Sequence, residues 1–178
     1  MFARNDELRD VLRRAASALK AHGPEFALAG GYALWAYGAP EPVHDVDFVV
    51  TEADTEVAAE TLAIAGFTID RTPEDWLFKA CLDGAVVDVL HRINGVPVDA
   101  ELIRSNEVID VLAIRMPVLS PTQVLIQKLR ALHEHYCDFA PLLPAVRAST
   151  VDNDFAVAFL VLIDRLGITG SCPPSPRP

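Results

Sequence analysis

A segment of alternating character, His-Asp-Val-Asp-Phe at residues 44–48, restricts the fold more than any other part of the sequence. Alternate residues of a strand project to opposite faces, so Asp45 and Asp47 share one face and the apolar residues share the other. The two Cα atoms would then lie roughly 6.6–6.8 Å apart. The two carboxylates can therefore share one or two divalent ions, although a lone Asp-x-Asp is more often a solvent-facing edge.

A third carboxylate stands inside an apolar segment. Asp88 lies within Val-Val-Asp-Val-Leu at residues 86–90, a pattern typical of a buried strand. A buried ionised carboxylate is costly unless a cation or a metal compensates its charge. The alternative is an Asp at an exposed edge, or one satisfied by hydrogen bonds. Together with Asp45, Asp47 and a Gly-Gly pair earlier in the chain, Asp88 favours a metal site.

The pair Gly30-Gly31 separates a short apolar run at residues 26–29, an expected strand, from a short helix expected over residues 32–37. Without side chains the backbone can approach a phosphate closely, and the start of a helix offers free N–H groups and a favourable dipole. Most Gly-Gly pairs are plain turns. Phosphate binding at this pair is therefore indicated only in combination with the three acids.

The remaining patterns predict an α+β fold with a mixed sheet flanked by helices over residues 1–117. A helical region over 118–170 and a disordered tail over 171–178 would follow. Asp83-Gly84 is a hairpin turn signal, and Ser120 with Gln123 forms a capping box for a helix running to about Tyr136. The first helix, over 6–21, would be capped by Asn5. Further helices are expected over 54–65, 138–148 and 152–166, and further strands over 45–50, 67–70, 76–82, 85–93 and, more weakly, 108–117.

Composition and charge exclude several classes of protein. The net charge of −10 argues against a broad basic surface for long nucleic acid, since phosphate binding needs clustered Lys and Arg, but it allows a local basic groove. The apolar stretch at residues 155–163 is too short to span a bilayer. The separated cysteines Cys81, Cys137 and Cys172 suggest neither a zinc site nor a disulfide framework. We therefore expect a cytoplasmic protein with reduced thiols and no membrane partner.

Three segments resemble the DNA polymerase β-like nucleotidyltransferase superfamily: Leu-Ala-Gly-Gly-Tyr-Ala at 28–33, the Asp-x-Asp segment at 44–48, and Val-Asp-Val at 87–89. That superfamily combines a Gly-Gly or Gly-Ser turn, an Asp-x-Asp and a third Asp on a later strand. The resemblance, which covers about residues 26–91, implies the nucleotidyltransferase fold. It also implies Mg²⁺ or Mn²⁺ held by Asp45, Asp47 and Asp88, and transfer of a nucleoside monophosphate from a nucleoside triphosphate with release of pyrophosphate.

The C-terminal part is similar to AbiEii/MenT-type toxin nucleotidyltransferases. Leu-Ser-Pro-Thr-Gln at 119–123 and Gln-Lys-Leu at 127–129 look like their helix carrying a nucleotide-contacting lysine, here Lys128. Asp138 resembles a further acidic position, although Tyr136 and Cys137 stand where a basic residue is usual. The resemblance implies a tRNA acceptor end and a cognate antitoxin as partners. The residues implied in nucleotide binding are Gly30, Gly31, Lys128 and Asp138, and those implied in catalysis are Asp45, Asp47, Asp88 and Lys128.

Two other functions stay open. The Gly-Gly and Asp-x-Asp segments are also similar to aminoglycoside nucleotidyltransferases, and an acidic surface would suit a cationic drug. A degenerate nucleotide-binding module is the non-enzymatic alternative, against which the intact set of three acids argues. Lys128 could neutralise triphosphate oxygens as a point charge, or could be a solvated residue of an amphipathic helix. Trp35 and Trp76 are interpreted as core residues rather than base-stacking platforms.

Overall fold

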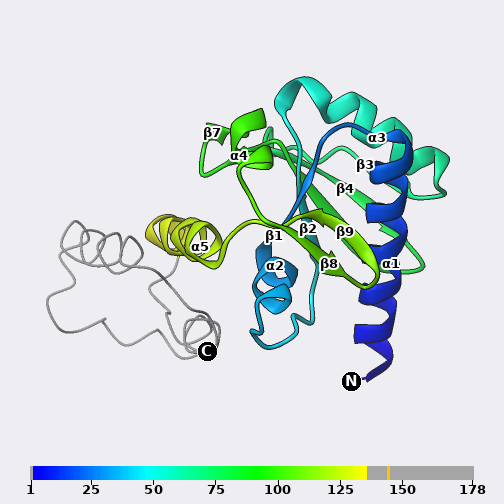
Figure 1. Cartoon of the computed structure of the whole chain (residues 1–178). Coiled ribbons are helices and arrows are strands. Elements are labelled where there is room, and N and C mark those ends of the chain that lie inside the picture. The colour runs from blue at the N-terminus through cyan, green and yellow to red at the C-terminus, as the bar shows by residue number, and fades with distance from the viewer. Residues whose placement is uncertain (1, 136–143, 145–178) are drawn as a thin grey trace, which may run out of the picture.

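The computed structural model describes residues 2–135 and the single position 144 (Figure 1). Helix α1 (Phe2–His22) buries one face with helical spacing. The helix begins before Asn5, so the predicted cap at Asn5 is wrong. The buried residues on that face are Leu8, Val11, Leu12, Ala15, Ala16 and Leu19.

A five-stranded mixed sheet forms the centre of the fold, in the order β1-β2-β5-β4-β3. The central pair β2 and β5 is parallel, and all other neighbouring strands are antiparallel. This sheet confirms the predicted α+β class with a mixed sheet. The strands are β1 (Ala27–Ala29), β2 (Val46–Val49), β3 (Thr68–Asp70), β4 (Leu77–Leu82) and β5 (Ala85–Leu90).

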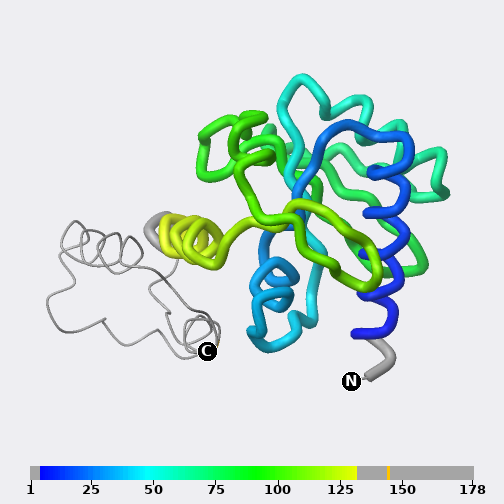
Figure 2. Tube along the Cα trace, in the orientation of Figure 1, coloured from blue at the N-terminus to red at the C-terminus, as the bar shows by residue number. Residues whose placement is uncertain are grey.

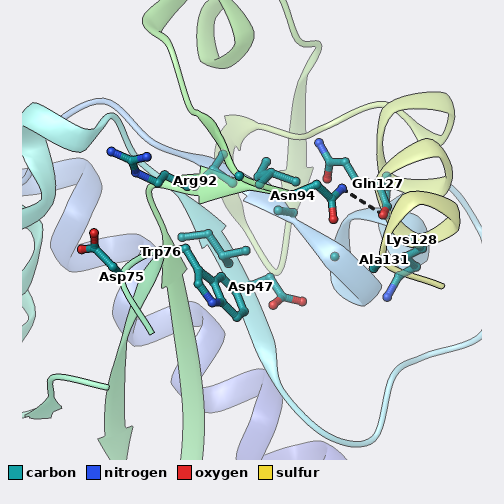
Figure 3. A pocket seen from close by; sticks show the side chains of 15 residues that line it. Asp47, Asp75, Trp76, Arg92, Asn94, Gln127, Lys128 and Ala131 are labelled. Carbon is teal, nitrogen blue, oxygen red and sulfur yellow. Dashed lines mark hydrogen bonds between the residues drawn. The ribbon is translucent and has the colours of Figure 1, made fainter. Parts of the chain in front are cut away.

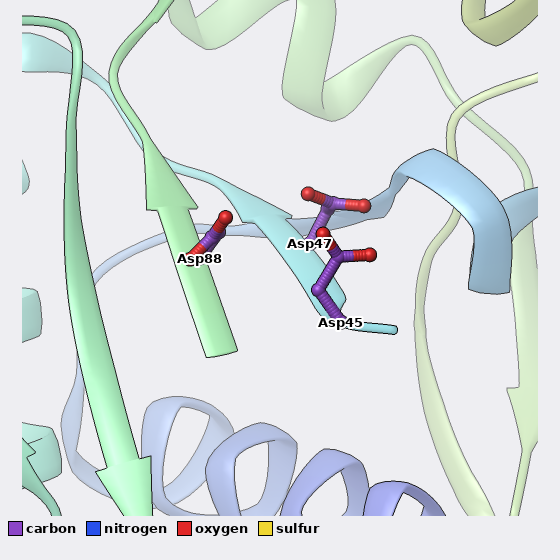
Figure 4. Close-up of side chains that lie close together, drawn as sticks. All are labelled: Asp45, Asp47 and Asp88. Carbon is purple, nitrogen blue, oxygen red and sulfur yellow. The ribbon is translucent and has the colours of Figure 1, made fainter. Parts of the chain in front are cut away.

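The two faces of the central strands have opposite character. Val46 and Phe48 of β2 pair with Val87 and Val89 of β5, and all four side chains are buried. Helices α1 and α3 (Thr55–Ile64) pack together and against the sheet on this apolar side. Asp47 and Asp88 alternate with these apolar residues and project to the other face, away from α1, as the sequence pattern predicts (Figure 4).

The smaller elements lie around the edges of the sheet. The segment after β9 passes beside β1, where the Leu119 N–H donates to the Leu28 carbonyl at 2.9 Å (Figure 2). Helix α5 then packs against α2. These elements are α2 (Gly30–Ala36), the 3₁₀ turn η1 (Glu52–Asp54), β6 (Arg92–Ile93), β7 (Val96–Pro97), α4 (Ala100–Arg104), β8 (Val108–Val111), β9 (Ile114–Pro117) and α5 (Pro121–His135).

Two predicted turn features are confirmed. Asp83 and Gly84 both have positive φ, 51° and 84°, as a tight hairpin turn requires. At the start of α5 the Gln123 N–H donates to Ser120 Oγ at 3.3 Å, while the Ser120 N–H donates to Gln123 Oε1 at 2.9 Å. The predicted capping box therefore begins the helix that carries Lys128.

Other boundaries differ from the predictions. The strand expected over 85–93 ends at Leu90, since His91 separates β5 from the short β6, and α4 was not predicted. Gly30 and Gly31 form the first turn of α2 rather than a separate turn before it. Asp138, the helices expected beyond it and the expected tail lie outside the described residues. Among the described helices, none has the length and apolar character needed to cross a bilayer.

Replacing Gly30 by Ala tests how tightly α2 packs against β2. Gly30 has a φ of 58°, and an added Cβ would overlap the Asp47 carboxylate. We expect Gly30→Ala to rotate Asp47 and to lower the free energy of unfolding by about 3 kcal/mol in denaturant titrations.

The matched control is Gly38→Ala. Gly38 has a φ of 97° but no atom within 4 Å of an added Cβ, so an alanine there would strain the backbone without a steric overlap. We expect this change to cost about 1 kcal/mol. Equal losses in the two variants would show that the contact with Asp47 contributes nothing.

Candidate active site

Three carboxylates converge on the polar face of the sheet. Asp47 of β2 lies directly opposite Asp88 of β5 in the parallel register, and Asp45 immediately precedes β2. One carboxylate oxygen from each side chain lies within 4.8 Å of the other two (Figure 4). The structure thus brings together the three residues that the sequence singled out.

Crowding and burial shift the protonation of this cluster. Burial, the charge of Asp45 and the charge of Asp88 raise the pKa of Asp47 to about 7, against the opposing effects of Lys128 and of the Gly31 backbone N–H. Burial also raises the pKa of Asp88, which is only 9% exposed. Three negative charges at this distance from one another need positive charge beside them.

The donor set fits a hard divalent cation. Carboxylate oxygens are the ligands that Mg²⁺ and Mn²⁺ prefer, and one or two carboxylates are enough to hold Mg²⁺ alongside substrate phosphates. Asp45, Asp47 and Asp88 supply three such groups within mutual reach. Burial and the mutual repulsion of the acids both raise the pKa of Asp47, and the charge of such an ion would oppose both effects, so the cluster is suited to binding one.

A lysine that sequence reasoning missed lies at the far side of the cluster. Lys79 of β4 pairs with Asp88 across the antiparallel ladder, and its Nζ lies 3.1 and 3.3 Å from the two Asp88 carboxylate oxygens. Burial lowers the pKa of Lys79, but the hydrogen bond and charge of Asp88 outweigh that effect and raise it overall. A two-residue turn at Asp83-Gly84 pairs Leu82 with Ala85 and hence Lys79 with Asp88. The Asp83-Gly84 turn in the sequence was therefore enough to predict that Lys79 lies opposite Asp88.

A cavity of about 710 Å³ opens beside Asp47, between the sheet and α5 (Figure 3). Gly30 and Lys128 line it together with Asp47, so the structure places these two predicted nucleotide-binding residues beside the acids. Gly31 does not line this cavity. It packs against Pro42, close enough that a Cβ there would lie 2.8 Å from the proline Cβ.

The interpretation of Trp76 as a core residue is wrong. Trp76 precedes β4, is 42% exposed and lines the cavity wall that faces α5 (Figure 3). Trp35, in contrast, packs against the core as expected, with its ring 5.6 Å from the Tyr32 ring in an edge-on arrangement. No pattern in the sequence distinguishes the two tryptophans, because exposure of Trp76 depends on the distant helix α5 leaving a gap beside it.

The ion pair of Lys79 and Asp88 should be energetically coupled. In EDTA, Lys79→Met leaves Asp88 without its cation, and we expect a loss of about 1–3 kcal/mol in the free energy of unfolding. In a double-mutant cycle with Asp88→Asn, the double variant should lose less than the sum of the single losses by at least about 0.5 kcal/mol.

The exposed ion pair of Arg71 and Glu56, with 2.6 Å between Arg71 Nη2 and Glu56 Oε2, serves as the control. Their side chains are 49% and 80% exposed, so Arg71→Met and Glu56→Gln should couple by less than about 0.5 kcal/mol. Additive losses for Lys79 and Asp88 would contradict the coupling inferred from the geometry.

Stability of the metal-free protein should depend on the protonation of Asp47. Its pKa is raised from 3.8 to about 7 on folding, so between these values the folded state holds a proton that the unfolded chain has released. The stability that this proton confers is complete below the unfolded pKa and is lost as the pH rises through the folded pKa. We expect the Tm in EDTA to fall between about pH 4 and about pH 7, and to depend little on Asp47 above that range.

Asp47→Asn should flatten that decline, because an amide does not titrate in this range. Glu60→Gln, on the exposed side of α3, should retain the wild-type decline. An unchanged decline in Asp47→Asn would show that other groups cause it.

Several solved structures share this fold. ANT(2″)-Ia in complex with adenylyl-2″-tobramycin superposes with a TM-score of 0.67 at 13% identity, over 88% of this chain and 97% of that chain. A nucleotidyltransferase-like protein from Paracoccidioides brasiliensis gives a TM-score of 0.58 at 15% identity, over 90% of this chain and 88% of that one. A Thermotoga maritima protein described as a candidate nucleotidyltransferase gives 0.57 at 18% identity, over 71% and 85%.

These likenesses, all below 20% identity, show the fold. No curated protein sequence matches the chain. Residues 8–145 match the family described as "Nucleotidyl transferase of unknown function (DUF2204)", which is well over half of the 178 residues. The chain belongs to this family and is a nucleotidyltransferase.

Proposed function

We propose that the protein transfers a nucleoside monophosphate from a nucleoside triphosphate to an acceptor hydroxyl, with Asp45, Asp47 and Asp88 holding Mg²⁺ or Mn²⁺. The observation that supports this proposal is the convergence of the three carboxylates, of which Asp47 lines a cavity together with Gly30 and Lys128. Bound divalent ions would offset the charge of the triphosphate and of the transition state.

The triphosphate would occupy the Gly30 and Lys128 end of the cavity. Gly30 has no side chain to block a phosphate, and the Lys128 ammonium already acts on the charge of Asp47 across the cavity. Gly31 would contribute through its backbone N–H, which faces the Asp47 carboxylate. Asp138, outside the described residues, is retained as a proposed nucleotide contact. We also propose residues 1–117 as a catalytic core and residues 118–170 as a helical region, of which α5 lines the cavity.

The acceptor would approach from the side of Asp88. In the reaction the acceptor oxygen forms a bond to the α-phosphorus, the bond from that phosphorus to the bridging oxygen breaks, and pyrophosphate leaves. Asp88 would accept the hydroxyl proton, a role that its raised pKa favours. Lys79, in contact with both Asp88 oxygens, would keep that carboxylate aligned with Asp45 and Asp47.

The acceptor that we propose first is the 3′ end of tRNA, with the protein acting in the cytoplasm as the toxin of a toxin–antitoxin pair. Two observations support an anionic acceptor. The segment at 119–129 resembles toxin nucleotidyltransferases, and the Lys79 ammonium lies beside Asp88 on the acceptor side. A single lysine also suits an RNA end better than a long duplex, which the net charge of −10 disfavours.

A cationic small molecule is the second candidate acceptor. The charge of −10 would attract an aminoglycoside, and ANT(2″)-Ia, solved with adenylyl-2″-tobramycin, shares the fold. The two candidates differ in which acceptor would receive the nucleotide, so a direct assay separates them.

Incubation with each labelled triphosphate, Mg²⁺ and either total tRNA or an aminoglycoside panel tests the proposal. Label in tRNA would support the first acceptor. Label in the drugs alone would replace it with the second, and no label in either would refute both.

Asp45→Asn and Asp47→Asn should each lower transfer by at least about a hundredfold, because each removes a carboxylate oxygen from the metal site. Asp110→Asn, on the exposed strand β8, is the matched control and should retain full transfer. Full activity in either variant of the Asp pair, with wild-type folding by circular dichroism, would refute the metal role.

A further inference from the structure

Trp76 is a large aromatic side chain with an unusual position. Its neighbours Leu77 and Phe78 are buried, whereas Trp76 is 42% exposed and extends into the cavity beside Asp47 (Figure 3). An indole half exposed to water forgoes much of the stabilisation that burial would give it. An apolar ring placed in this way at a cavity wall is available to a ligand.

The backbone presents this ring rigidly. The Trp76 carbonyl accepts the backbone N–H groups of His91, at 3.0 Å, and of Arg92, at 3.3 Å. These bonds tie the residue to the chain that leaves β5 two positions after Asp88. The distance from the indole to the acids is therefore set by the sheet rather than by a free loop.

Helix α5 supplies the facing wall. Val124, Gln127, Lys128 and Ala131 follow helical spacing and all line the same cavity (Figure 3). The Asn94 side chain of the β6–β7 turn donates to the Gln127 carbonyl at 3.2 Å and ties that turn to the helix. The cavity between Trp76 and α5 thus has an aromatic wall and a facing wall of apolar and polar side chains.

We propose that Trp76 is the stacking platform for the base of the nucleoside triphosphate. This inference rests on the proposed function, because Asp47, Gly30 and Lys128 in the same cavity would hold the phosphates of the same molecule. A base has an aromatic face that stacks on indole whatever its edge, and such stacking is sequence-tolerant. The cavity thereby has charged groups for the triphosphate and an aromatic face for the base.

Fluorescence of Trp76 gives a direct test. The chain has two tryptophans, so Trp35→Phe leaves Trp76 as the only indole. In Mg²⁺ and without acceptor, each of the four nucleoside triphosphates should quench its fluorescence on binding. Inorganic triphosphate, which has phosphates but no base, should bind without quenching. Equal quenching by inorganic triphosphate, or nucleotide binding by calorimetry without quenching, would overturn the proposal.

Affinity measurements separate stacking from a structural role. Trp76→Ala should raise the Kd for nucleoside triphosphate about tenfold while leaving the Kd for inorganic triphosphate unchanged. Trp76→Phe retains an aromatic face and should restore most of the affinity. A parallel loss of affinity for inorganic triphosphate would indicate a structural role instead. A rise in acceptor KM with unchanged nucleotide affinity would assign the ring to the acceptor, and either result refutes the proposal.

These experiments test the base-stacking proposal separately from the proposed function. If the wild-type protein transfers nucleotide and Trp76→Ala binds the triphosphate normally, this inference is wrong and the transferase proposal stands. If nucleotides quench Trp76 and no acceptor is ever labelled, base stacking stands and the proposed reaction is wrong.

Discussion

Repulsion among three carboxylates on one sheet face is the constraint around which the rest of the structure is arranged. Asp47 and Asp88 are direct neighbours in the parallel ladder, so the backbone itself holds them at a distance that free side chains would avoid. The opposite face of the same two strands buries Val46, Phe48 and their partners against helices. Hydrophobic burial on one face therefore stabilises an electrostatically unfavourable arrangement on the other.

Two lysines offset this charge from opposite sides. Lys79 reaches Asp88 from the neighbouring strand, and Lys128 acts on Asp47 from helix α5. The first is set by hairpin register and the second by the packing of a distant helix. This separation gives the site two distinct ends: one at Gly30 and Lys128, where we propose that a triphosphate binds, and one at Asp88 and Lys79, from which we propose that the acceptor approaches.

The placement of α5 also decides what kind of cavity stands beside the acids. Its first turn is held by the capping box of Ser120 and Gln123, and its middle is tied to the β6–β7 turn through Asn94. Because the helix packs against α2 and leaves Trp76 uncovered, an indole that could have joined the core becomes part of the cavity wall. A single helix thus contributes one of the two lysines of the site and leaves the aromatic wall uncovered.

The sequence by itself determined the features that depend on local periodicity. Alternation placed Asp45 and Asp47 on one face, the apolar segment around Asp88 predicted a buried strand, and Asp83-Gly84 predicted the hairpin that also sets the position of Lys79. Only the tertiary structure decided that α2 begins at Gly30, that Lys128 faces Asp47 and that Trp76 is exposed. Those outcomes depend on contacts between segments far apart in the chain, and neither helical nor strand periodicity carries information about such contacts.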